Sequence, residues 1–338
     1  MRRSRHWQRI RDGVSRMPAL QPENPLASPD TAWREAGGEN VLVGTAGWAD
    51  PSLVRSRRFY PPGCATAEAR LRFYASQFPT VEVDSSYYAM PSRRNSMLWV
   101  DRTPDDFLFN VKAFRALTLH QTPRKAMPPD LLAELHEDGR PNVYYKDMPA
   151  TVRDELWRRF IDAVEPLSHA GKLGALHFQF PPWFVSAREN YDYMRNVRER
   201  LAGFHIAIEF RHHSWFDDEH HEATLLFERE LGLVNVVVDE PQGLKTSVPA
   251  VWEITNPEMA VVRLHGRNVD TWEAKGVNSL SDRFNYDYSH AELVDLSLQA
   301  ARLAQHAHTV QIIFNNSFDG QGVRNGRMLQ GILASDAC

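Results

Sequence analysis

The chain has 338 residues, of which 43% are hydrophobic and 24% are charged, and its formal net charge at pH 7 is −4. This composition is typical of a globular protein. It lacks the apolar stretch of about 18 residues that a transmembrane helix needs, and the net negative charge disfavours a general nucleic-acid coat. Cys64 and Cys338 are the two cysteines, and they lack metal-type spacing. We therefore expect a cytoplasmic protein without disulfides.

The first 38 residues differ in composition from the rest of the chain. An arginine-rich start is followed by several prolines, and the apolar segment of an export signal is absent. We predict that residues 1–38 form a flexible, solvated tail, with anchoring to an acidic partner as the alternative. The folded domain is then expected over residues 39–335.

Eight short apolar runs follow, and they read as buried parallel strands. Stretches with helical character separate most of them, so the alternation predicts an α/β fold: a single (β/α)8 TIM barrel, whose functional sites form at the carboxyl ends of the strands. The runs are residues 41–46, 80–84, 107–112, 173–180, 205–210, 234–239, 260–265 and 310–315.

The connections between these runs differ in length and pattern. We expect helices over 66–77, 92–102, 151–169, 187–202, 218–231 and 322–334, and a capped helix that starts at Ser289 with Glu292 completing a capping box. The connection 240–259 has weak helical signal, and residues 266–288 form a long polar loop. Residues 121–149 are rich in proline and polar groups, which predicts an insertion after the third strand, lying over the barrel mouth.

Most runs end in polar side chains that share one face of the strand. Because side chains alternate along a strand, the apolar face is expected to meet the helices and the polar face to point into the barrel mouth. Buried charges are costly unless they are paired or functional, so this convergence favours a ligand site. The candidate residues are Glu82, Asp84, Lys112, Gln179, Glu209, Arg211, Asp239, Arg263, His265, Asn315 and Asn316, with Trp48, Tyr88 and Trp215 following strand ends.

Several strings of the sequence together resemble one family. They are VGTAGW (43–48), FYPPG (59–63), FPTVEVDSSYYAMPS (78–92), TPDDFLFNVKAFRALTLH (103–120), LGALHFQFPPWF (173–184), AIEFRHHSW (207–215), VVRLHGR (261–267) and FNNSFDGQGVRNGRML (314–329). In this order they resemble the DUF72 family, also called YecE-like. The resemblance implies a TIM barrel and no settled activity or cofactor. Asp84 stands where the family usually has asparagine, which adds a negative charge at the mouth.

Chemical roles can be assigned to the candidates from their residue types. His265 and Glu209 are the expected acid and base, since an unperturbed histidine titrates near neutrality, and Glu82 and Asp84 are further candidate catalytic acids. Lys112, Arg211 and Arg263 are expected to bind anionic groups, with Lys112 paired to Glu82 or Glu209. Amides and aromatic side chains suit hydroxyl recognition and ring stacking. The mixture of acids and cations predicts coupled titration and at least one shifted pKa.

Three readings of function remain open. The leading one is a metal-independent enzyme, a hydrolase or isomerase without a cofactor, acting on a small phosphorylated, sugar-like or nucleotide-like ligand. A non-catalytic barrel that binds a ligand or a nucleic-acid end is the first alternative. The second is a metal-dependent isomerase or endonuclease-like barrel with metal ligands from Glu82, Glu209, Asp239 and His265. The nearby basic side chains would repel a metal ion and so count against this alternative.

Overall fold

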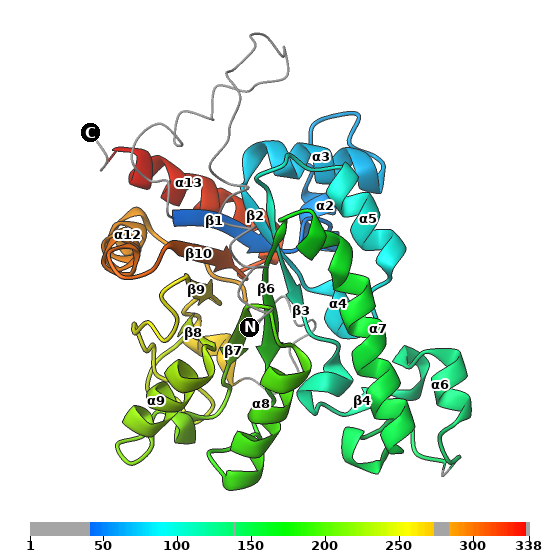
Figure 1. Ribbon diagram of the computed structural model, residues 1–338. Coiled ribbons are helices and arrows are strands. Elements are labelled where there is room, and N and C mark those ends of the chain that lie inside the picture. Colours follow the sequence, from blue (N-terminus) through cyan, green and yellow to red (C-terminus); the bar gives the residue numbers. More distant parts are fainter. Residues whose placement is uncertain (1–40, 138, 274–283, 336–338) are drawn as a thin grey trace, which may run out of the picture. The chain divides into compact units, whose positions relative to one another are not determined.

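The computed structural model describes residues 41–137, 139–273 and 284–335, and the predicted tail 1–38 and Cys338 lie outside them. Eight parallel strands close into a barrel in the order β1-β10-β9-β8-β7-β6-β3-β2 (Figure 1). All eight predicted strands are confirmed. They are β1 (Val41–Ala46), β2 (Thr80–Val83), β3 (Leu108–Lys112), β6 (Leu173–Gln179), β7 (Ile206–Glu209), β8 (Val234–Asp239), β9 (Met259–Leu264) and β10 (Thr309–Phe314).

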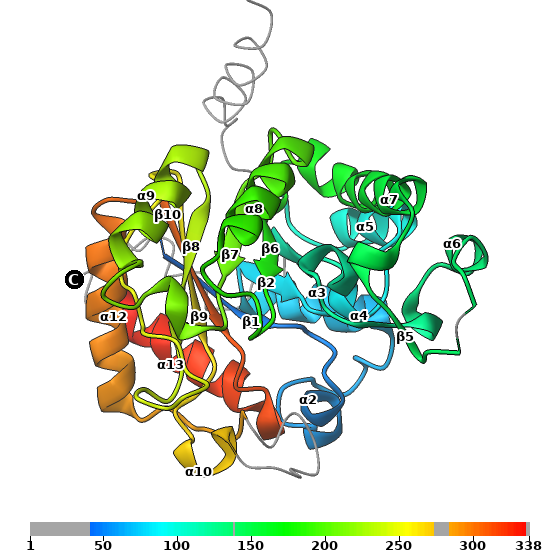
Figure 2. The same cartoon turned by 90° about the horizontal axis from the view of Figure 1, so that it is seen from below.

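Helices surround the barrel (Figure 2). The longer ones match the expected helices and are α3 (Ala67–Gln77), α5 (Arg93–Asp101), α7 (Ala150–His169), α8 (Arg188–Arg200), α9 (His221–Leu231), α12 (His290–Ala304) and α13 (Gln321–Ser335). Short helices are α2 (Pro51–Ser56), α4 (Ser85–Tyr88), α6 (Pro129–Ala133) and α10 (Val269–Trp272). The capping box of Ser289 and Glu292 is present at α12, and the connection from β8 to β9 has no helix.

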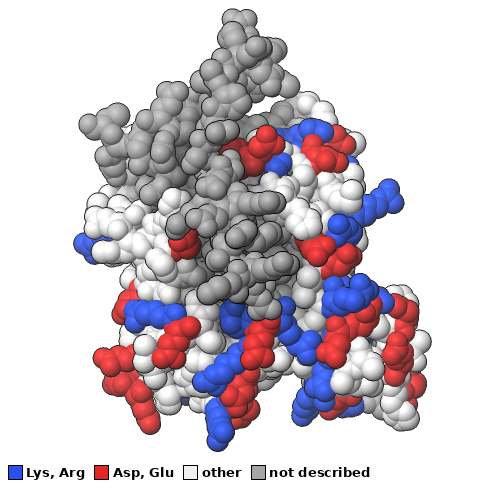
Figure 3. Space-filling view, viewed as in Figure 1, with Lys and Arg blue, Asp and Glu red and all other residues white. Residues whose placement is uncertain are grey.

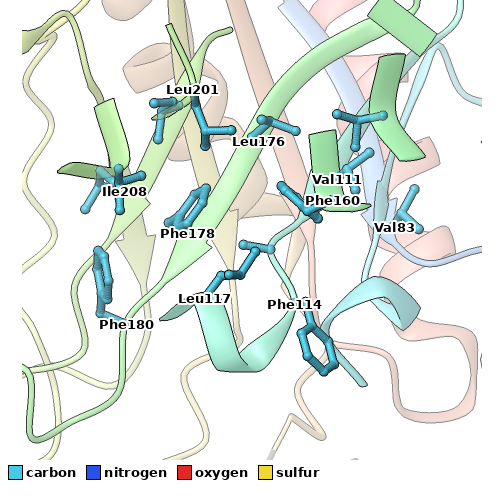
Figure 4. Close-up of a cluster of buried hydrophobic side chains, with 14 of the residues drawn as sticks. Val83, Val111, Phe114, Leu117, Phe160, Leu176, Phe178, Phe180, Leu201 and Ile208 are labelled. Carbon is cyan, nitrogen blue, oxygen red and sulfur yellow. The ribbon is translucent and has the colours of Figure 1, made fainter. Parts of the chain in front are cut away.

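The helix-facing sides of the strands carry the apolar core. On one side of the barrel, α7 and its neighbours cover β3, β6 and β7, and Figure 4 shows Val111, Phe160, Leu176, Phe178 and Ile208 packed there. On the other side, a second cluster joins β1, β9 and β10 to α12 and α13. Burial of these faces is the main driving force for assembling helices on the sheet.

The described residues of 121–149, which leave out residue 138, pack beside the barrel and not over its mouth (Figure 2). The segment forms a small antiparallel pair, β4 (Thr122–Pro123) with β5 (Asn142–Val143). Tyr145 accepts a 2.9 Å hydrogen bond from the Trp157 indole of α7, and Arg159 of α7 forms an ion pair with Asp130. Figure 2 shows α6 at the periphery, outside α7. The expected position over the mouth is therefore wrong for this part of the segment, because its apolar side chains join the outer core.

A polar layer lies inside the barrel on the side of β2, β3 and β10, beside an apolar inner cluster from β6, β7, β8 and β9. The Gln311 carboxamide oxygen accepts hydrogen bonds from Asn110 at 2.7 Å and from Thr80 at 3.1 Å. Glycine at position 174 leaves space for the Asn110 and Gln311 side chains, since a Cβ there would lie 2.6 Å from Asn110 Oδ1. These buried amides satisfy one another, as buried polar groups must, and together with the apolar inner cluster they fill the barrel interior.

Candidate functional site

Strand register brings the predicted polar side chains to the inside of the barrel. Glu82 pairs in register with Asn110, Gln179 with Glu209, and Val238 with Arg263. Register partners in a parallel sheet point to the same face. The predicted polar face is therefore confirmed as the inner face for Glu82, Glu209 and Arg263.

Arg263 joins the two buried carboxylates. Its Nη2 donates to Glu82 Oε1 at 2.7 Å and its Nη1 donates to Glu209 Oε2 at 2.5 Å. All three side chains are at most 1% exposed. Each carboxylate thus receives a charge-assisted hydrogen bond from one guanidinium, which is among the strongest pairings available to a buried acid.

His177 completes this group, although the sequence reasoning gave it no role. Its Nε2 lies 3.1 Å from Glu209 Oε2 and its Nδ1 lies 2.9 Å from Glu82 Oε2, the second contact being out of line for a hydrogen bond. Strand alternation already places His177 with Gln179 on the polar face, and that position is the signal for its place in the interior. We call Glu82, His177, Glu209 and Arg263 the buried ion cluster.

The buried ion cluster shifts the pKa values of its acids. Burial by itself would raise the pKa of Glu82 and of Glu209, but the Arg263 charge and the neighbouring histidines outweigh it and hold both well below their usual range. Burial would also lower the pKa of Arg263, and the two carboxylates raise it instead. Glu82, Glu209 and Arg263 therefore stay ionised at neutral pH, in agreement with the expectation of at least one shifted pKa.

Above this cluster, Lys112 forms an ion pair with Asp84. The distance from Lys112 Nζ to Asp84 Oδ1 is 2.8 Å, so its direct partner is neither of the expected acids, Glu82 and Glu209. Asp84 follows β2 directly, and its side chain is 31% exposed. Burial would lower the pKa of Lys112, but Asp84 outweighs it and raises the pKa. The pair therefore places an accessible carboxylate and a permanent cation at the mouth.

His265 lies between Glu209 and Asn315. Its Nε2 is 3.3 Å from Glu209 Oε1, and its Nδ1 is 2.8 Å from the Asn315 amide, which is partly exposed. Burial lowers the pKa of His265 to about 4 in spite of Glu209. The imidazole is therefore neutral at pH 7, which corrects the expectation of titration near neutrality.

Arg211 pairs mainly with a residue that the sequence reasoning overlooked. Its Nη1 donates to Glu240 at 2.6 Å and to Glu209 at the longer distance of 3.4 Å. Burial raises the pKa of Glu240 although Arg211 opposes it. Arg211 and Gln179 are both partly exposed at the strand ends, so both remain available to a ligand.

Asp239 and Asn316 do not join this group, which corrects two predicted ligand-binding residues. Asp239 pairs in register with Leu264, on the helix-facing side, and its carboxylate accepts hydrogen bonds from Arg267 and Tyr288. Asn316 is fully buried and its amide donates to Tyr286 and Asn325. Both side chains hold the segment after β9 onto the outer helices, because strand alternation turns them away from the interior.

The three predicted aromatic residues have different positions. Trp215 is fully buried, stacks on Phe210 at 4.2 Å, and donates its indole N–H to a backbone carbonyl. Trp48 is partly buried and packs edge-on against Trp99 at 5.8 Å. Trp215 is a core residue, so its prediction as a ligand-binding residue is corrected, whereas Trp48 stays a candidate. Tyr88 is 49% exposed and stays a candidate.

The comparisons with known proteins agree with one another. Residues 42–337 match the family model described as "Protein of unknown function DUF72". The chain belongs to the DUF72 family. It is 33% identical to the UPF0759 protein YunF of Bacillus subtilis (strain 168) over 87% of this chain and 94% of that one.

Solved DUF72 structures share this barrel. A DUF72 family protein from Enterococcus faecalis V583 has a TM-score of 0.72 and 27% identity, covering 87% of this chain and 95% of its own. Another from Thermotoga maritima MSB8 has a TM-score of 0.67 and 29% identity, covering 87% and 99%. The family description assigns no activity, so the function of this DUF72 protein has to be argued from its own residues.

The interior of this DUF72 barrel does not offer an arrangement suited to a metal ion. No group of three or more His, Cys, Asp or Glu side chains among residues 41–137, 139–273 and 284–335 could hold one. The physical reason is that the Arg263 guanidinium already occupies the space between Glu82 and Glu209. A cation there would meet a like charge at hydrogen-bond distance from both acids.

Proposed function

We propose that the barrel mouth binds a small anionic or polyhydroxylated molecule and acts on it by acid–base chemistry, as a hydrolase or isomerase. The observation that carries this is the partly exposed ion pair of Asp84 and Lys112 directly above the buried ion cluster. Buried ion pairs rarely improve stability over apolar packing. A barrel interior that keeps several of them therefore favours a role in fixing charge for a ligand.

The side chains divide into binding and proton-transfer groups. Lys112 and Arg211 supply cations for an anionic group of the ligand, and Gln179 and Asn315 supply amides for its hydroxyls. Asp84 is the exposed acid of the set and would accept a hydrogen bond from the ligand.

Glu209 and His265 are the proposed proton-transfer pair. A ligand that displaces the Asn315 amide would meet Nδ1 of a neutral imidazole. When Nδ1 takes a proton from the ligand, an imidazolium forms. Glu209 lies 3.3 Å from the other ring nitrogen, Nε2, and would stabilise that positive charge. An acid that orients and stabilises a histidine is a recurrent arrangement in proton-transfer sites.

The test begins with ligand binding and then asks for turnover. Inorganic phosphate, sugar phosphates, uronic acids and mononucleotides are screened by thermal shift, and bound compounds are followed by NMR for product. We expect Lys112→Met to weaken binding at least tenfold, and His265→Gln and Glu209→Gln to abolish turnover while binding persists. Arg93→Met, which removes two exposed ion pairs between α5 and α7, is the matched control and should leave both unchanged.

Binding without turnover is the second candidate function, and one observation favours it. Glu209 is fully buried, His265 Nδ1 already contacts the Asn315 amide, and His265 Nε2 lies 3.3 Å from Glu209 out of line for a hydrogen bond. If bound compounds are never converted, or if the His265 and Glu209 variants convert them at the wild-type rate, the proton-transfer role fails and a binding protein remains.

A nucleic-acid partner and a metal-dependent reaction are less well supported. Figure 3 shows acidic and basic side chains interspersed on the visible face, without a continuous basic surface among the described residues. Arg263 opposes a cation between the interior acids. Among the described residues, no helix has the length and apolar character to cross a membrane. The low cysteine content supports the cytoplasmic location that we propose, which cell fractionation would test.

A further inference from the structure

Four aromatic rings form a continuous row at one side of the barrel mouth. Tyr88 meets Tyr87 edge to face at 5.0 Å, Tyr87 meets His120 at 5.2 Å, and His120 meets Trp183 at 5.8 Å. They follow β2, β3 and β6, which are neighbours in the barrel. We call Tyr87, Tyr88, His120 and Trp183 the aromatic rim.

The two ends of the aromatic rim are unusually exposed. Trp183 is 59% exposed and Tyr88 is 49% exposed, and within the described part of the chain they are the two aromatic residues among the exposed large hydrophobic side chains. Trp215, which also follows a strand end, is buried in the core. An open aromatic surface beside polar groups is typical of a site that stacks a ring.

Cations lie directly beside the aromatic rim. Lys112 Nζ is 5.0 Å and the Arg115 guanidinium carbon is 5.1 Å from the centre of the Tyr87 ring. The Lys112 ammonium donates one hydrogen bond among the described residues, to Asp84, so N–H groups remain for a ligand. An anionic group bound there would be next to the aromatic surface.

His120 behaves as a neutral ring in this row. Its Nδ1 is 2.9 Å from the Thr118 hydroxyl, and burial, with the nearby Arg115 and Lys112 charges, lowers its pKa to about 3. A neutral imidazole between two aromatic rings adds apolar surface and no cation. The positive charge beside the rim therefore comes from Lys112 and Arg115.

We infer that the ligand carries a ring as well as an anionic group, with the ring stacked on Trp183 or Tyr88 and the anion bound by Lys112. This inference rests on the proposed function, because it divides the same mouth into a ring subsite and an anion subsite. The shared chemistry is a ring with an apolar face, which either a nucleobase or a sugar can supply.

The experiment compares probes with and without a ring by isothermal titration. AMP and glucose 6-phosphate carry a ring and a phosphate, whereas glycerol 3-phosphate and inorganic phosphate carry the anion alone. Stacking on one aromatic side chain contributes about 1–3 kcal/mol, or roughly 5- to 150-fold in Kd. We expect at least one ring-bearing probe to bind more tightly than glycerol 3-phosphate by such a factor, and Trp183→Ala or Tyr88→Ala to remove that advantage.

The variants separate this inference from the proposed function. Met97→Ala on α5, which removes an equally exposed apolar side chain, should change nothing. If both rim variants bind every probe as tightly as the wild type while Lys112→Met does not, the ring subsite is refuted and the anion site stands. If the wild type binds none of the four probes, both proposals fail. A preference for AMP over glucose 6-phosphate identifies a base as the ring, and the reverse identifies a sugar.

Discussion

Arg263→Met is the substitution for which the structure makes the sharpest stability prediction. Arg263 is the shared partner of Glu82 and Glu209, which are fully buried. Breaking a buried ion pair by removing one partner costs about 3–5 kcal/mol. With about 2 °C for each kcal/mol in a domain of this size, Tm should fall by roughly 6–10 °C.

The pH dependence of the loss distinguishes the charge from simple packing. In the wild type the folded pKa values of Glu82 and Glu209 are depressed, so their stabilisation is present above the unfolded pKa and is lost in acid. Without Arg263, burial dominates and raises both pKa values, so stability falls as pH rises above the unfolded pKa. The difference between Arg263→Met and wild type should therefore grow from pH 5 to pH 8.

Urea unfolding followed by circular dichroism at pH 5, 6.5 and 8 measures this difference. Arg93→Met removes exposed ion pairs and should cost no more than about 1 kcal/mol. The triple variant Glu82→Gln, Glu209→Gln and Arg263→Met removes the unpaired charges and should recover part of the loss. A loss that is equal at all three pH values, or no larger than that of Arg93→Met, would refute the reasoning.

Three further substitutions test other parts of the structure. Glu228 is fully buried without a hydrogen-bond partner among the described residues, and burial raises its pKa well above the usual range; its folded form keeps a proton that the unfolded chain loses. The free energy of unfolding of the wild type, relative to that of Glu228→Gln, should therefore fall by up to about 1.4 kcal/mol per pH unit above the unfolded pKa. Urea unfolding at pH 5 and pH 7.5 measures this difference, and an equal difference at both pH values would contradict the prediction. Gly174→Ala places a Cβ 2.6 Å from a buried amide oxygen and should destabilise the fold by about 1–3 kcal/mol. Gly331→Ala, with open space around the added Cβ, is the control and should not destabilise the fold. Thermal melts of the two variants compare them. Tyr288→Phe removes a 2.7 Å hydrogen bond to the Asp239 carboxylate and should lower the free energy of unfolding in urea by about 1.5–3 kcal/mol. A smaller loss would show that Arg267 alone holds that carboxylate.

Much of the fold could be predicted from local pattern. The eight apolar runs and the helices between them carry their own signals, because burial of a strand and the capping of a helix depend on residues close in sequence. Strand alternation also placed Glu82, Glu209 and Arg263 on one face. The same rule, carried through β8, would have assigned Asp239 to the outer side and the next residue, Glu240, to the inner side.

What the sequence by itself determined is therefore the barrel, the family, and the inward direction of most of the polar side chains at the strand ends. Which of them pair was decided only by the tertiary structure. Lys112 binds Asp84 and not Glu82, His177 completes the buried ion cluster, and Trp215 is buried while Trp183 is exposed. These outcomes depend on distances between strands far apart in the chain and on how closely the helices cover each ring, and no local pattern encodes either.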